Sequence, residues 1–179
     1  MMHSIWAGVD FGSRIAGTTA ITFLVEDQLK TVQVQKGQDT DLWLSKMIAD
    51  YHLNPVFIDA PLSLPDAYFH KGEDFNFRSA DRILKAMSPM FLGGLTARAM
   101  KLKTTLSKIG ISCIEVYPGG FVRQNPGFIT IYHKKNPTAV DTMFDALYSN
   151  LPFEKVDRPM NIHQLDSLIS WYIGYRYII

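Results

Sequence analysis

The chain has 179 residues, 47% of them hydrophobic and 20% charged, which is typical of a globular protein with a sizeable core. We expect one domain over residues 1–179. The net charge of +1 excludes the global basic field of many nucleic-acid binders, although a local basic groove would suffice. No apolar run reaches the ~18 residues of a membrane span, and a single cysteine, Cys113, excludes an internal disulfide. We therefore expect a cytoplasmic protein in a reducing setting, with no membrane partner.

The first third of the chain has the apolar pattern of short strands interrupted by one amphipathic helix. The predicted elements are strands over 5–10, 17–25 and 29–35, a helix over 39–51 and a strand over 56–59. The first three strands are joined by short turns, which predicts an antiparallel meander. A helical connection before the fourth strand implies that it pairs in parallel.

The rest of the chain is predicted to be mainly helical. Residues 62–95 are irregular, and an irregular stretch of this length is usually functional or mobile. The predicted elements are helices over 77–87, 96–109 and 138–150, a strand over 111–117, a loop-rich stretch over 118–137 and a buried final helix starting near residue 161. Asn161 and Gln164 resemble a capping box for that last helix. This order predicts a mixed α/β sheet with helices on its faces.

Four acidic residues occupy apolar settings. They are Asp10, Asp59, Glu115 and Asp166. A carboxylate in an apolar environment is costly unless something pairs with it, so four of them suggest a shared cation. Turn formation is the alternative for the two residues that end predicted strands, Asp10 and Asp59. For Glu115 the alternative is a salt bridge to Arg78, Arg82 or Arg98.

Several basic residues are candidates for a supporting role. His163 lies three residues before Asp166, so both share one helix face and His163 is a possible base or ligand. Its alternative is a capping or surface residue. Arg78 and Arg82, with Lys134 in a later loop, are candidate phosphate-binding residues. A local ion pair for the arginines and a plain surface position for the lysine remain the alternatives.

Five motifs in order resemble the RNase H-like superfamily, in particular a family of predicted nucleases with that fold. They are Gly8-Val9-Asp10-Phe11-Gly12-Ser13, Ile58-Asp59-Ala60-Pro61-Leu62, Arg78-Ser79-Ala80-Asp81-Arg82, Ile114-Glu115-Val116-Tyr117-Pro118 and His163-Gln164-Leu165-Asp166-Ser167-Leu168. The resemblance covers nearly the whole chain and extends coarsely to Holliday-junction resolvases. It implies a mixed five-stranded sheet whose first three strands are antiparallel, with helices on both faces. It also implies metal ligands at Asp10, Asp59 and Asp166, with Glu115 as a nearby fourth acid.

The function implied is hydrolysis of phosphodiester bonds with two Mg²⁺ or Mn²⁺ ions, which prefer carboxylate oxygens. In this reading Asp10 bridges the ions, Asp59 and Asp166 complete their shells, Glu115 orients water and His163 helps proton transfer. The partner is then a nucleic acid, with DNA and RNA equally open, as are branched and linear substrates and the oligomeric state.

Two other classes of function fit parts of the sequence. The spacing Asp10-x-Gly-x-x-x-x-Gly17 resembles the phosphate-binding turn of actin-like and sugar-kinase ATPases, of which this chain has room for one half. Such a half could bind a nucleotide without hydrolysing it. A non-catalytic interaction module is the other alternative, with the aromatic C-terminal helix around Trp171 and Tyr175 as its partner surface.

Overall fold

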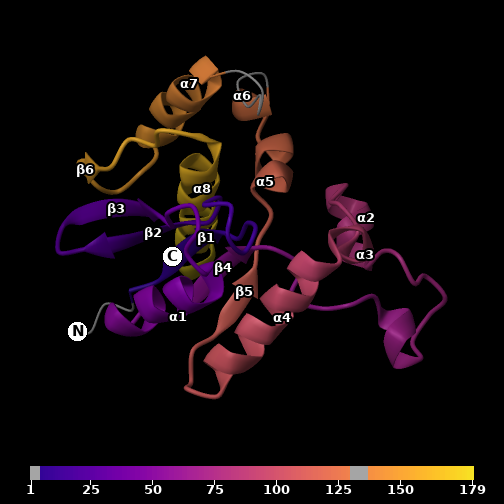
Figure 1. Cartoon of the computed structure of the whole chain (residues 1–179). Coiled ribbons are helices and arrows are strands. Elements are labelled where there is room, and N and C mark those ends of the chain that lie inside the picture. The colour runs from indigo at the N-terminus through magenta and orange to yellow at the C-terminus, as the bar shows by residue number, and fades with distance from the viewer. Residues whose placement is uncertain (1–4, 130–136) are drawn as a thin grey trace.

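The structure, a computed structural model, describes residues 5–129 and 137–179. Its centre is a six-stranded sheet in the order β5-β4-β1-β2-β3-β6. The strands are β1 (Ala7–Asp10), β2 (Ala20–Val25), β3 (Gln28–Gln33), β4 (Val56–Asp59), β5 (Cys113–Glu115) and β6 (Lys155–Val156). The helices around it are α1 (Thr40–Asp50), α4 (Gly94–Ser107), α5 (Pro118–Gln124), α6 (Pro126–Ile129), α7 (Pro137–Tyr148) and α8 (Ile162–Ile178). Figure 1 shows these helices arranged around the sheet.

The sheet has the mixed pairing that the sequence predicts. Strands β1, β2 and β3 form an antiparallel meander, whereas β4 runs parallel to β1 and β5 runs parallel to β4. The topology is broadly RNase H-like. The expectation of five strands is wrong, because β6 adds a sixth strand parallel to β3. Two residues are too short a strand to produce an alternating pattern in the sequence.

Each face of the sheet has its own hydrophobic core. On one face, Val9 and Ile58 pack with residues of α1 and α4, such as Leu44 and Leu102. On the other face, α8 lies against the central strands and forms a second core with α5 and α7. Because both faces are covered, β1 and β4 are short, nearly continuous apolar runs, each ending in an aspartate.

Helix α8 approaches the sheet unusually closely, and glycines permit this. A Cβ atom added to Gly8 on β1 would lie 2.0 Å from the backbone nitrogen of Trp171. A Cβ atom added to Gly174 would lie 2.4 Å from the Phe57 ring. The backbone of α8 therefore rests almost directly on β1 and β4, and this contact fixes which α8 residues reach the end of β1.

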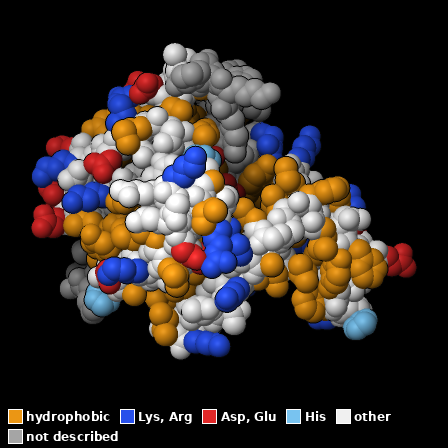
Figure 2. All heavy atoms as spheres, in the orientation of Figure 1, with side chains coloured by type: hydrophobic (Ala, Val, Ile, Leu, Met, Phe, Trp, Pro, Cys, Tyr) orange, Lys and Arg blue, Asp and Glu red, His pale blue; other side chains and the backbone are white. Residues whose placement is uncertain are grey.

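A long excursion separates β4 from α4 and extends to the right of the sheet in Figure 1. It contains the 3₁₀ helix η1 (Asp66–Phe69) and the short helices α2 (Ser79–Leu84) and α3 (Pro89–Leu92). Figure 2 shows hydrophobic side chains gathered over this part of the molecule. Its large exposed apolar residues are Tyr68, Phe69, Phe75, Ile83, Met87, Met90 and Phe91. The helix predicted over 77–87 corresponds to α2, which is shorter than expected.

Three other sequence expectations need correction. Within the described part of 118–137 the chain forms helices α5 and α6, where loops were expected. The predicted strand over 111–117 shrinks to β5. Asn161 caps α8 as expected, but the Gln164 side chain accepts from the N–H of Met160, so the capping box is not completed. Over the described ranges, the chain has no helix that is both long enough and apolar enough to cross a membrane.

Candidate functional site

Two aspartates end neighbouring strands in register. Asp10 of β1 pairs with Asp59 of β4 in a parallel ladder. Residues paired in this way project from the same face of a sheet. Because Gly8 lies against α8, the alternation along β1 places Asp10 on the α8 face as well. The two carboxylates therefore share one face and one edge, at the carboxyl ends of the strands, where α/β proteins commonly bind ligands.

The first turn of α8 brings a histidine to this edge. The Asn161 side chain accepts from the N–H groups of His163 and Gln164, which fixes the start of the helix. Nδ1 of His163 then lies 2.7 Å from Oδ2 of Asp10. An ionised carboxylate can only accept hydrogen bonds, so the donor in this contact is the Nδ1–H group of His163. Within residues 5–129 and 137–179, the other Asp10 oxygen has no hydrogen-bond partner.

Asp166 follows His163 by one turn on the same flank of α8 and is 2% exposed. The next residue, Ser167, hydrogen-bonds Thr22 of β2 at 2.8 Å, which anchors this turn to the sheet. Asp10, Asp59 and His163 thus lie at one edge, and Asp166 follows one turn further along α8. Within the described ranges, however, no three His, Cys, Asp or Glu side chains converge closely enough to hold a metal ion in this conformation.

Glu115 belongs to a different arrangement, a partly buried guanidinium network. Arg78 donates to both oxygens of Glu115, at 2.6 and 2.5 Å, and to both oxygens of Asp81. It also donates to the Ser63 hydroxyl, while the N–H of Leu62 donates to Glu115. The salt-bridge alternative for Glu115 is therefore confirmed, with Arg78 as the partner. These bonds use all five N–H groups of Arg78, so a phosphate could bind them only by displacing a carboxylate.

The Arg78 side chain is 13% exposed and its two partners keep its pKa above the ordinary value for arginine, although burial opposes this. Asp81, the buried member of the network, lies within the motif Arg78-Ser79-Ala80-Asp81-Arg82, and the sequence did not predict a role for it. Its signal was the spacing Arg-x-x-Asp at the start of a helix, where the aspartate also accepts from the N–H of Arg78.

The other candidate arginines also have carboxylate partners. Arg82 donates to Asp74 through two nitrogens. Arg98 pairs with Asp41 at 2.6 Å and donates to the carbonyl of Gly12. Lys134, the third phosphate candidate, lies outside the described residues.

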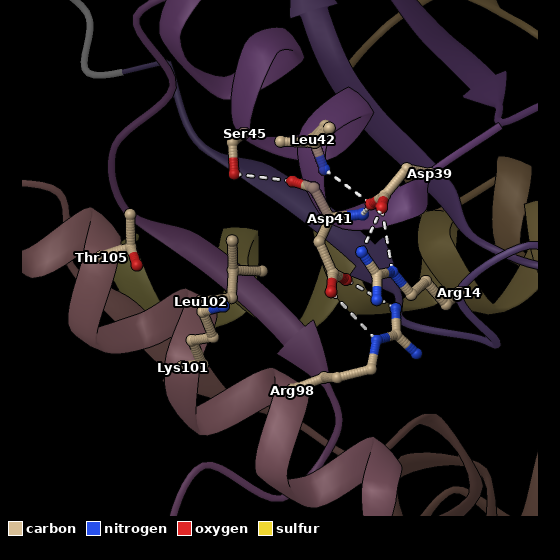
Figure 3. Close-up of a pocket in the computed structure, with 9 residues that line it drawn as sticks. All are labelled: Arg14, Asp39, Asp41, Leu42, Ser45, Arg98, Lys101, Leu102 and Thr105. Carbon is tan, nitrogen blue, oxygen red and sulfur yellow. Dashed lines mark hydrogen bonds and ion pairs between the residues drawn. The ribbon is translucent and has the colours of Figure 1, made fainter.

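Figure 3 shows a separate cavity of about 310 Å³ between α1 and α4. There Arg98 and Arg14 lie against Asp41 and Asp39, so both guanidinium groups have their charge offset by a carboxylate. Lys101 also lines this cavity, but both guanidinium groups are already paired, which makes it a weaker candidate than the sheet edge.

The turn after β1 uses its own backbone donors. The N–H of Gly12 donates to the Thr19 hydroxyl at 2.9 Å, and the N–H of Ser13 donates to the Thr18 hydroxyl at 3.0 Å. A phosphate-binding turn presents such groups to its ligand. Here a phosphate would have to replace bonds within the turn.

A cavity of about 250 Å³ opens beside Asp59, and sequence reasoning did not anticipate it. Its apolar lining comes from Phe11, Leu84, Met87, Leu92, Leu95, Val116 and Tyr117, among others. Arg78, Asp81 and Glu115 also line it. The signal was the long excursion over 62–95, which folds over the end of β4.

The chain matches no known family model and no curated protein. The geometry of the sheet edge is therefore the basis for a functional assignment.

Proposed function

We propose that the chain is a nuclease that hydrolyses phosphodiester bonds with Mg²⁺ or Mn²⁺, and that Asp10, Asp59 and Asp166 hold the cation. The observation that carries this proposal is the in-register pair of aspartates at the ends of two parallel strands. Two adjacent carboxylates at this spacing repel each other, so the pair has an electrostatic cost that positive charge must offset. A shared hard cation removes the repulsion and favours oxygen ligands.

The His163 contact supports the same assignment. A carboxylate that binds a metal is commonly oriented by a hydrogen bond to its second oxygen. His163 makes such a bond to Oδ2 of Asp10, which leaves Oδ1 for the cation. In the proposed reaction His163 holds Asp10 in place and can exchange a proton with the leaving group. A bound divalent cation would supply an activated water and stabilise charge on the phosphate.

Binding requires the carboxylates to move closer than they lie in this conformation, since no three of the described ligand-type residues converge here. Rotation of the Asp59 and Asp166 side chains about their χ angles, on fixed strands and a fixed helix, is the movement we propose. Glu115 is not included among the ligands, because Arg78 occupies both of its oxygens.

Asp10→Asn and Asp166→Asn test the proposal, with Mn²⁺ binding followed by titration calorimetry. Cleavage is followed on labelled single-stranded, duplex and branched DNA and RNA. Loss of a hydrogen-bond partner of a ligand typically costs 10–100-fold, so loss of a ligand itself should lower cleavage by more than about a hundredfold. Asp50→Asn, at an exposed position of α1 paired with Lys46, is the matched control and should behave like the wild type. Full cleavage by both Asp10→Asn and Asp166→Asn would refute the assignment.

A further inference from the structure

The cavity beside Asp59 adjoins the proposed catalytic edge directly. Asp59, at the end of β4, lines this cavity together with Ala60 and Pro61, which follow it in the chain. Helix α2, the α3 region and the start of α4 close the other sides through apolar residues such as Leu84, Leu92 and Leu95. A group bound there would lie next to whatever Asp59 binds.

The walls of the cavity combine apolar side chains with carboxylate acceptors. Tyr117 supplies an aromatic ring, which is held by the Arg123 guanidinium 5.2 Å from its centroid. On the polar side, every N–H of Arg78 is already used, so the network offers carboxylate oxygens to a ligand rather than donors. Glu115 is the accessible member, with a side chain 33% exposed. Such a pocket fits a planar ring that carries N–H donors, as nucleobases with exocyclic amino groups do.

Two cationic side chains lie beyond Leu84, a residue that lines both this cavity and a neighbouring one. Arg123 donates to the backbone carbonyls of Leu84 and Lys85, so it is fixed beside α2. Lys85 is exposed at the end of that helix. Arg123 and Lys85 line that neighbouring cavity, where their charges are available to phosphates further along a bound strand.

We propose that this cavity, the Asp59 pocket, holds one unpaired nucleobase of the nucleic-acid substrate, with its phosphodiester at the Asp10–Asp59 edge. The inference rests on the proposed function, because it names the substrate class of that site. A base in a continuous duplex is stacked and paired, and taking it out has an energetic cost. The enzyme should therefore prefer single strands, branch points or mismatches over intact duplex.

Ala80→Phe tests the pocket by filling it. Ala80 is an exposed residue of α2 that lines the cavity, so the larger ring can enter without removing any member of the Arg78 network. Ala49→Phe, at an exposed position of α1 outside the cavity, is the matched control. The probe is a single-stranded oligonucleotide with a central 2-aminopurine, whose fluorescence reports base stacking. Binding is measured in EDTA, so that it does not depend on a catalytic cation.

The wild type and Ala49→Phe should bind the probe with a change in 2-aminopurine fluorescence, and Ala80→Phe should bind about tenfold more weakly. Equal binding by all three proteins would overturn the pocket assignment, even if cleavage with Mn²⁺ is normal. Binding that Ala80→Phe weakens, in a protein that cleaves no substrate, would support the pocket while removing the nuclease proposal. AMP binding as tight as that of the oligonucleotide would also overturn the inference, because the base would then not belong to a longer substrate.

Discussion

Two sets of acidic residues, the Arg78 network and the Asp10–Asp59 pair, differ in what balances their negative charge. Glu115 and Asp81 share one arginine, whose guanidinium is permanently charged and fully hydrogen-bonded. Asp10 is held instead by a single bond from an imidazole, which leaves one carboxylate oxygen without a partner within the described residues. The first arrangement joins segments of the fold. The second keeps a carboxylate oriented and able to accept a further ligand.

The contacts of the Arg78 network indicate that its main role is to hold segments of the fold together. Through Arg78 it ties the start of α2 to the end of β5, and the N–H of Leu62 ties the segment after β4 to Glu115. The network therefore fixes the wall of the Asp59 pocket. It contributes to the proposed site by position, whereas Asp10 is proposed to contribute by direct ligation.

The largest expected effect comes from breaking this network. Arg78→Met leaves Asp81, which is 2% exposed, as a buried carboxylate without its partner. Removing one partner of a buried ion pair costs about 3–5 kcal/mol, and the partial exposure of Glu115 favours the lower end. Urea unfolding measures the change. Lys46→Met, which removes an exposed pair with Asp50, is the control and should leave the midpoint unchanged. A midpoint shift for Arg78→Met as small as that of the control would show that the network is not a structural tie.

A smaller effect is expected where α8 rests on β1. Gly8→Ala places a methyl group against the α8 backbone, which must move, and overpacking of this kind costs about 1–3 kcal/mol. Because α8 carries His163 and Asp166, the same change should weaken Mn²⁺ binding. Gly94→Ala, where an added Cβ has nothing within 4 Å, is the control for both measurements. Loss of stability with unchanged Mn²⁺ affinity would separate the α8 contact from the site.

The acidic residues at the strand ends were predictable from the sequence. Asp10 and Asp59 each close a short apolar run, and such runs are recognisable without a structure. The helical connection before β4 predicted its parallel pairing, but the register that aligns Asp10 with Asp59 comes from the structure. His163 and Asp166 were placed together because they lie three residues apart on one helix.

The Arg78 network and the Asp59 pocket depend on long-range contacts that local sequence patterns do not encode. Arg78 and Glu115 are 37 residues apart, so three arginines were equally good partners for Glu115 in the sequence. The Asp59 pocket is formed by an excursion with few periodic apolar positions, and its short helices end after four to six residues. Strand β6 escaped prediction for the same reason, since its pairing with β3 is specified by residues more than 120 positions away.

The smallest expected effect concerns the bond that distinguishes Asp10. His163→Ala removes the donor to Oδ2 of Asp10. Loss of a group that orients a metal ligand typically lowers metal affinity by about 10–100-fold. We expect a loss of about tenfold in Mn²⁺ affinity, at the lower end, because this hydrogen bond is partly exposed. His163→Asn restores an N–H donor near the position of Nδ1 and should recover most of the affinity for Mn²⁺. The fold should tolerate both changes, since one hydrogen bond contributes about 1 kcal/mol. Equal loss in both variants would indicate that the imidazole itself ligates the cation, and unchanged affinity in His163→Ala would mean that Asp10 needs no support. Weak Mn²⁺ binding by His163→Ala, together with nearly wild-type binding by His163→Asn, is the result that assigns His163 the role of holding Asp10.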